Sequence, residues 1–213
     1  TIPAAIIQLA TTINSNFSPS ITQSWAKGDY NSVLQELRMA MKMSIVIVSV
    51  PIVTFCCLGV DFYRLWQPTL DPVVLTILSV LGCSAFIVLA GTQVLYNVLT
   101  ASNRLKINSL SFLAMGVVNV LGVYFGLKYC SRYGMYIIIG TSSILTTIRQ
   151  LVIILPYTAK LLNQHWATFY KEIFLTLACC FINAVLAFVV IKILPVSDWF
   201  AIIYDAIIIA SFA

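Results

Sequence analysis

Charged residues are scarce in this sequence. Asp, Glu, Lys and Arg make up 9% of the 213 residues, hydrophobic residues make up 61%, and the mean hydropathy is +0.99. A soluble domain carries about 25% charged residues, because water must solvate its surface. The scarcity therefore excludes a soluble enzyme, a nucleic-acid-binding domain, a coiled coil and a disordered tail. The solvent that suits this composition is a lipid bilayer.

Residues for covalent or metal chemistry are also scarce. The sequence has one His, no CxxC pair, and no GxSxG, HExxH or P-loop motif. The six cysteines lie mostly inside apolar runs, where we interpret them as small hydrophobic side chains. We therefore expect no catalytic residue, no metal site and no cofactor.

Long windows without charge indicate transmembrane helices. Five windows predict spans across a bilayer, namely 43–60, 72–103, 107–127, 133–148 and 173–191, and the span that begins at 133 runs on past Arg149 to about 155. Helices close their own hydrogen bonds in lipid, and the alternating strands of a membrane barrel are missing. Both ends of the sequence lie in apolar segments, so we expect two cut spans and a longer parent protein. The predicted fold is an all-α polytopic bundle of about seven spans, five complete and two cut.

The polar segments divide the chain into four regions. We predict a cut helix plus a cytoplasmic loop with a surface helix (1–42), a four-helix core (43–158), an interfacial linker (159–172) and a truncated helix pair (173–213). Loops one, three and five carry seven Lys and Arg residues and the other loops carry four, so the former are expected in the cytoplasm. All four tryptophans fall at predicted span ends, as in an aromatic belt.

Two connecting segments carry more detailed expectations. Ser18-Pro19 should end the first helix, 27–29 should form a turn, and 31–42 should form a helix at the cytoplasmic surface. The linker should lie in the interface in a similar way. Its predicted apolar face is Leu161, Leu162, Trp166, Phe169 and Tyr170.

Polar side chains inside the predicted spans recur at helical spacing, which places them in stripes. Because such groups are costly in hydrocarbon, their alignment is informative. The candidates to line a substrate path are Gln93, Asn97, Asn119, Thr146, Arg149 and Gln150. For Gln93, Asn97 and Asn119, bonding between helices and a water-filled path remain equal alternatives. The GxxxG spacing of Gly122 and Gly126 favours close helix packing.

Arg149 is the most informative of these candidates. It lies seven residues before Pro156, so about 10 Å along the helix axis. One interpretation is that its side chain extends to the lipid headgroups. The other is that it faces an aqueous cavity, where its planar fork binds a phosphate or other anion.

Several short motifs occur in an order that resembles one known family. They are 17–22 (FSPSIT), 26–29 (AKGD), Pro51, 58–59 (LG), 65–66 (LW), 96–108 (YNVLTASNRLKIN), 133–134 (YG) and 155–157 (LPY). Together they resemble the multidrug/oligosaccharidyl-lipid/polysaccharide exporter superfamily over most of residues 15–165. The segment 96–108 is similar to its polysaccharide flippase branch.

The resemblance implies an architecture and a function. The family has two six-helix bundles around a cavity, sometimes with two added C-terminal helices, so this chain would be the C-terminal half of a MATE-like transporter. Flippases of this branch move a polyprenyl-diphosphate-linked oligosaccharide across the bacterial inner membrane by alternating access, often coupled to H⁺ or Na⁺. The implied partners are this lipid-linked oligosaccharide, membrane lipids and other polysaccharide-assembly proteins, with no nucleic acid. The alternatives are a multidrug/cation antiporter of the same superfamily, a membrane scaffold and a glycan enzyme.

Overall fold

The structure is a computed structural model that describes residues 2–193 and 199–211, and every regular element in this part of the chain is a helix. The helices are α1 (Ile2–Ala26), α2 (Tyr30–Trp66), α3 (Pro72–Thr92), α4 (Leu95–Ala101), α5 (Leu105–Tyr129), α6 (Gly134–Ile148), α7 (Leu155–Leu161), α8 (Tyr170–Ile193) and α9 (Trp199–Ser211). A 3-10 turn, η1 (Ser131–Tyr133), precedes α6, and a π-helical segment, η2 (Arg149–Ile154), joins α6 to α7. The all-α prediction is confirmed.

Five helical segments in the described residues are long and apolar enough to cross a membrane. They are Tyr30–Trp66, Pro72–Thr92, Leu105–Tyr129, Ser131–Leu161 and Tyr170–Val189. They correspond to the five complete spans predicted from the sequence. The second predicted span, 72–103, is shorter than expected because the helix breaks at Gln93 and Val94.

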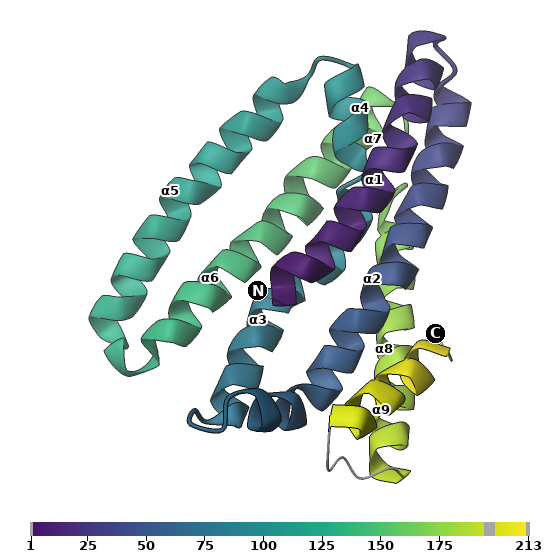
Figure 1. The fold of residues 1–213 in the computed structure, drawn as a ribbon. Helices are drawn as coiled ribbons and strands as arrows, with labels where there is room; N and C mark the ends of the chain where they lie inside the picture. The colour runs from purple at the N-terminus through teal and green to yellow at the C-terminus, as the bar shows by residue number, and fades with distance from the viewer. Residues whose placement is uncertain (1, 194–198, 212–213) are drawn as a thin grey trace.

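The connections between helices lie at two ends of the molecule. In Figure 1 the α1–α2, α4–α5 and α7–α8 connections lie at the top, and the α2–α3 and α5–α6 connections lie at the bottom. The top connections are loops one, three and five, which carry most of the loop Lys and Arg residues. The basic loops therefore share one end, as the positive-inside pattern requires.

The largest apolar core lies toward this end and joins α1, α2, α4, α7 and the start of α8. Leu37, Met41 and Leu99 are fully buried in it. The segment 31–42 is helical as predicted, and it forms the first part of α2, which runs without interruption from Tyr30 and buries Leu37 and Met41 in this core. The 37 residues of α2 span about 55 Å, well beyond a hydrocarbon core of about 30 Å.

The first helix also continues further than predicted. α1 passes through Pro19 and ends at Ala26, so the expected end at Ser18-Pro19 is wrong. Ile21, two residues after the proline, is completely buried against α2, and this packing outweighs the local preference. Gly28 then makes the turn at φ +73°, and the Asp29 side chain caps α2 by accepting from the Ser32 amide at 3.1 Å. Hydrogen bonds from Ser32 hold the pKa of Asp29 below its ordinary value.

The linker 159–172 is not one continuous helix. α7 ends at Leu161, turns follow, and α8 begins at Tyr170. The predicted apolar face is split, because Leu162 and Phe169 are buried in the core whereas Trp166 is 60% exposed.

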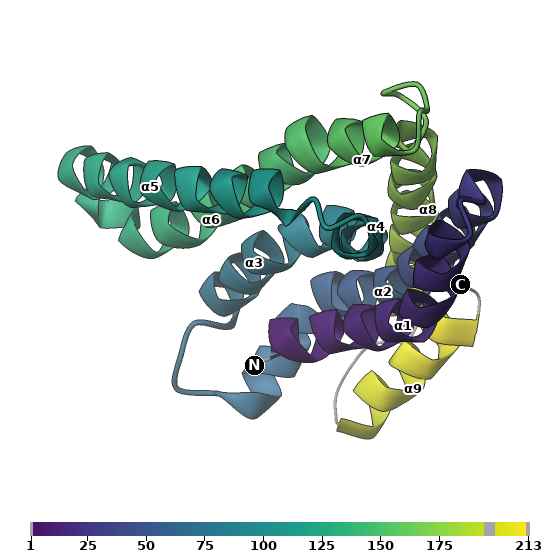
Figure 2. The same cartoon turned by 90° about the horizontal axis from the view of Figure 1, so that it is seen from above.

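Helices α5 and α6 form a pair that extends away from α1, α2 and α8, as Figure 2 shows. α5 has no buried residue among its 25. The GxxxG spacing lies against α6, where a Cβ built on Gly126 would lie 2.5 Å from Cγ2 of Ile137 and one on Gly122 would lie 3.0 Å from Cγ2 of Thr141. The packing interpretation of this motif is confirmed.

Candidate anion-binding site

The site is built around the π-helical turn η2. Pro156, just after this turn, accounts for its hydrogen bonding. The Leu155 amide bonds to the carbonyl of Gln150, five residues back, and Pro156 has no amide hydrogen to donate. The Leu151 carbonyl therefore receives no bond from either residue. The Tyr170 hydroxyl, at the start of α8, donates to it at 2.5 Å. A hydrogen bond from another helix thus stabilises the π turn. Such turns are frequent at functional sites.

Arg149, the first residue of this turn, points between α4 and α5. Its Nη1 donates to Oδ1 of Asn108 at 3.1 Å, and its Nη2 donates to the Tyr96 hydroxyl at 2.7 Å. Its Cζ lies 5.1 Å from the ring centroid of Phe112, a cation–π geometry. The residue is only 8% exposed. This geometry favours the cavity interpretation of Arg149 over extension to the headgroups.

The charge of Arg149 has no counter-charge among the side chains that the structure describes. The ion pairs there are Arg38 and Lys42 with Glu172, and Arg64 with Asp61. Both hydrogen-bond partners of Arg149 are neutral. A buried charge without an opposite charge is costly in a membrane, so an anion or water that meets the guanidinium would stabilise the arrangement.

A cavity of about 260 Å³ opens beside Arg149, between α3, α5 and α6. Its lining residues are Leu89, Phe112, Met115, Gly116, Asn119, Ser142, Leu145, Thr146 and Arg149. No acidic side chain is among these described residues. At about 30 Å³ per water molecule, the volume corresponds to roughly nine waters, which suits a small anion and not an oligosaccharide.

The structure brings three of the six predicted residues onto this wall. Asn119, Thr146 and Arg149 line the cavity together. Within the described structure, Oδ1 of Asn119 is buried without a hydrogen-bond partner. Gln150 is fully buried beside the cavity and donates through Nε2 to the Tyr96 hydroxyl at 2.8 Å, so it contacts the same oxygen as Arg149.

The other two predicted residues do not line the cavity. Gln93 lies between α3 and α4 and Asn97 lies in α4, and the backbone between them bonds three residues back, so the α-helical spacing of the predicted stripe is not kept here. Nδ2 of Asn97 donates to Asn14 of α1, at 2.7 Å to Oδ1 and 3.3 Å to the main-chain oxygen. For Asn97, this contact supports bonding between helices over a water-filled path. Gln93 is half-buried, and its Oε1 has no partner in the described part of the chain.

Sequence reasoning missed the role of Tyr96. The hydroxyl of Tyr96 receives two hydrogen bonds, one from Arg149 and one from Gln150. These residues lie 53 and 54 positions away, so no local spacing relates them to Tyr96. The only available signal was its place next to Asn97 in the 96–108 motif.

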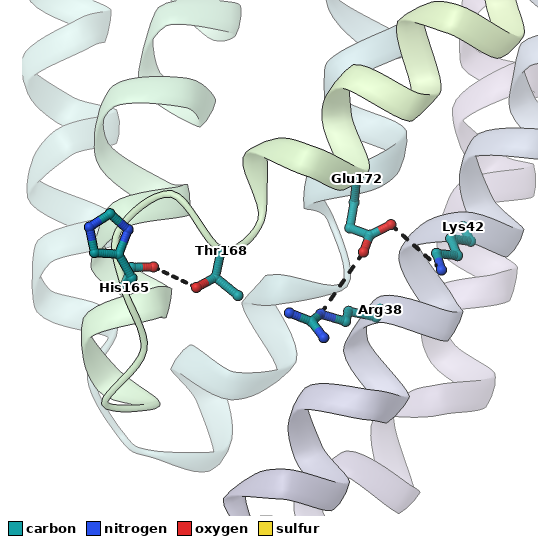
Figure 3. A network of polar contacts seen from close by, with 5 residues as sticks. All are labelled: Arg38, Lys42, His165, Thr168 and Glu172. Carbon is teal, nitrogen blue, oxygen red and sulfur yellow. Dashed lines mark hydrogen bonds and ion pairs between the residues drawn. The ribbon is translucent and has the colours of Figure 1, made fainter.

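A second polar cluster lies where α8 begins. Glu172 is 5% exposed and faces Arg38 Nε and Lys42 Nζ of α2, each 3.9 Å from a carboxylate oxygen, as Figure 3 shows. In the preceding loop the Thr168 hydroxyl donates to the carbonyl of His165 at 2.7 Å. Because two basic residues one turn apart meet one carboxylate, this cluster joins α8 to α2. In the described residues, no three His, Cys, Asp or Glu side chains gather as metal ligands.

Comparisons with protein-family models, with curated proteins and with solved structures found no match to this chain.

Proposed function

We propose that this chain is the C-terminal half of a flippase. The proposed cargo is a polyprenyl-diphosphate-linked oligosaccharide, moved from the inner to the outer leaflet of a bacterial inner membrane by ion-coupled alternating access. The observation that supports the proposal is the buried Arg149, which has neutral partners and lies on the wall of a cavity. The cargo's diphosphate supplies the missing negative charge.

The guanidinium retains the donors that such a cargo requires. Arginine has five N–H donors in a planar fork, and the contacts to Asn108 and Tyr96 use one on each terminal nitrogen. The remaining donors can form parallel bonds to two phosphate oxygens. The low dielectric of the cavity wall strengthens these bonds.

The size of the cavity indicates which part of the cargo it can hold. About 260 Å³ has room for the diphosphate, whereas the oligosaccharide and the polyprenyl chain must lie outside it. In the proposed transporter, Arg149 therefore recognises the group that all such lipid-linked cargoes share. Recognition of the diphosphate would let one carrier move cargoes that differ in their sugars.

The charge of the wall disfavours the multidrug/cation antiporter. A cationic drug in this cavity would meet the Arg149 guanidinium, and no acidic side chain among the described lining residues would offset the repulsion. A scaffold has no need for a buried, unpaired cation beside a cavity. The flippase is the candidate that uses both features.

The proposal is tested by replacing Arg149, and so removing its hydrogen-bond donors, in bacteria that depend on this protein for surface polysaccharide. Arg149→Ala should lower export about 10- to 100-fold, because hydrogen bonds to charged groups contribute about 1.5–3 kcal/mol each. Arg149→Lys should retain part of the export, since it keeps the charge and loses the fork. The measurement is surface polysaccharide per membrane-inserted protein.

Arg104→Ala is the matched control, because Arg104 is exposed in the turn between α4 and α5. It should export normally. Normal export by Arg149→Ala would remove the guanidinium from the mechanism. A normal surface combined with new drug sensitivity would favour the antiporter instead.

A further inference from the structure

The short helix α4 connects the candidate anion site to α1. Its adjacent residues Tyr96 and Asn97 contact different neighbours. Tyr96 bonds to Arg149 at 2.7 Å, and Asn97 bonds to Asn14 of α1 at 2.7 Å. α4 continues from α3 through Gln93 and Val94, both in the right-handed helical region, where the Tyr96 and Asn97 amides bond to carbonyls three residues back. The side-chain contacts of Tyr96 and Asn97 add to this backbone connection and to the burial of the apolar residues of α4.

The Tyr96 hydroxyl acts as a double acceptor. It receives Nη2 of Arg149 at 2.7 Å and Nε2 of Gln150 at 2.8 Å. A phenol oxygen has limited acceptor capacity, and two short bonds use it. Consecutive residues of the π turn therefore converge on one oxygen, which fixes the turn and the guanidinium together.

The plane of the guanidinium depends on this oxygen. Asn108 holds the other terminal nitrogen at 3.1 Å, and the Phe112 ring lies 5.1 Å from Cζ. Two hydrogen bonds on opposite nitrogens define the plane, whereas one alone allows rotation about that contact. A fork binds two phosphate oxygens in parallel only when its plane is set beforehand.

We propose that Tyr96 is the positioning residue that orients Arg149 for its anion, and that α1 holds Tyr96 in place through the Asn97–Asn14 bond. The inference rests on the proposed function, because it assumes that Arg149 binds a diphosphate. It adds a link between the anion site and α1. A displacement of α1 relative to α5 and α6 turns the guanidinium and changes anion affinity.

The experiment measures binding of inorganic diphosphate to the purified full-length protein in lipid nanodiscs by calorimetry. Tyr96→Phe removes the acceptor and keeps the ring, and should weaken binding about tenfold. In an Arg149→Lys background the same change should have no further effect, because an ammonium has no plane to orient. Tyr157→Phe, at a half-buried tyrosine packed against the same core, is the matched control and should bind as wild type does.

A second variant tests the link from α1. Asn14→Leu removes the side-chain oxygen that Asn97 bonds and should weaken diphosphate binding about threefold, with a smaller effect when combined with Tyr96→Phe. This variant also keeps the inference testable if Tyr96→Phe does not fold. Unchanged binding in Asn14→Leu would overturn the link to α1.

The remaining outcomes separate the inference from the proposed function. If wild type binds diphosphate and Tyr96→Phe binds it equally well, the positioning role is overturned and the proposed function stands. A loss of equal size in the wild-type and Arg149→Lys backgrounds would also overturn it, because Tyr96 would then act on packing alone. If wild type binds no diphosphate, the proposed function fails and the inference fails with it.

Discussion

The polar side chains inside this helical bundle divide into those that pack between helices and those that line a cavity. Asn97 bonds to Asn14, and Nδ2 of Asn183 donates to Ser49 of α2 at 3.3 Å. Such pairs satisfy an amide that hydrocarbon cannot solvate, and so they hold helices together. Arg149 and Asn119 line a cavity, and Arg149 also bonds to Tyr96 of α4 and Asn108 of α5. A polar group that lacks sufficient protein partners marks a place where water or a ligand is needed.

This division predicts which positions water reaches. In a cysteine-free protein, Asn119→Cys should react with a water-soluble thiol reagent at least about tenfold faster than Asn97→Cys, because reaction requires a hydrated thiolate. Asn119 lines the cavity, whereas Asn97 lies against α1. The measurement is the labelling rate in reconstituted protein.

Val120→Cys is the control for this labelling experiment. Val120 is 69% exposed on α5, a span apolar enough to lie in lipid, so exposure there does not mean contact with water. It should remain unreactive. An inert thiol at 119 would mean that the cavity is not hydrated, and equally fast reaction at 97 and 119 would mean that water also reaches the contact between α4 and α1.

Among the helices themselves, α5 depends on α6 for its position. α5 has no buried residue, and its glycines Gly122 and Gly126 face α6 at close distance. In lipid, helix association depends on such close packing, since burying apolar surface contributes little. The wall of the cavity is therefore only as stable as the α5–α6 contact.

Gly126→Ala should weaken that contact. The new Cβ would lie 2.5 Å from Cγ2 of Ile137, and overpacking of this kind costs about 1–3 kcal/mol. Gly140→Ala in α6 is the matched change, because a Cβ there meets nothing within 4 Å, and it should be neutral or stabilising by up to about 1 kcal/mol. Equilibrium unfolding in mixed micelles measures the free-energy difference. Equal stabilities would show that α5 and α6 are not held by this contact.

The elements also show what sequence patterns can predict in this chain. The scarcity of charge predicted the five spans, because charged side chains are costly in lipid and long windows without charge are visible in the sequence itself. Helix breaks and continuations depend on contacts between distant residues. α1 continues past Pro19 because Ile21 is buried, and the π turn at Arg149 is stabilised by Tyr170.

The same limit applies to the candidate site. Helical spacing placed Thr146 and Arg149 on one face, and both line the cavity. Spacing alone could not assign Asn97 to packing or find Tyr96, because their partners lie 83 and 53 positions away along the chain.

At the scale of the whole molecule, charge and topology agree. The loops rich in Lys and Arg share one end in Figure 1, and the α5–α6 turn lies at the other. The positive-inside rule then predicts that the α5–α6 turn lies outside the cytoplasm. That turn carries Cys130, which alone is exposed among the cysteine side chains that the structure describes.

Cys130 therefore reports the orientation of the whole bundle. A membrane-impermeant maleimide added to right-side-out spheroplasts should label the wild-type protein, and Cys130→Ser should abolish most of this labelling, because the half-buried Cys56, Cys57 and Cys179 lie within spans. Lys27→Cys in the Cys130→Ser background should react only after permeabilisation, since Lys27 lies in the turn between α1 and α2. The reverse pattern would place the basic loops outside. The α4–α5 turn that adjoins the Arg149 site would then face away from the cytoplasm, where a cargo from the inner leaflet could not enter by that end.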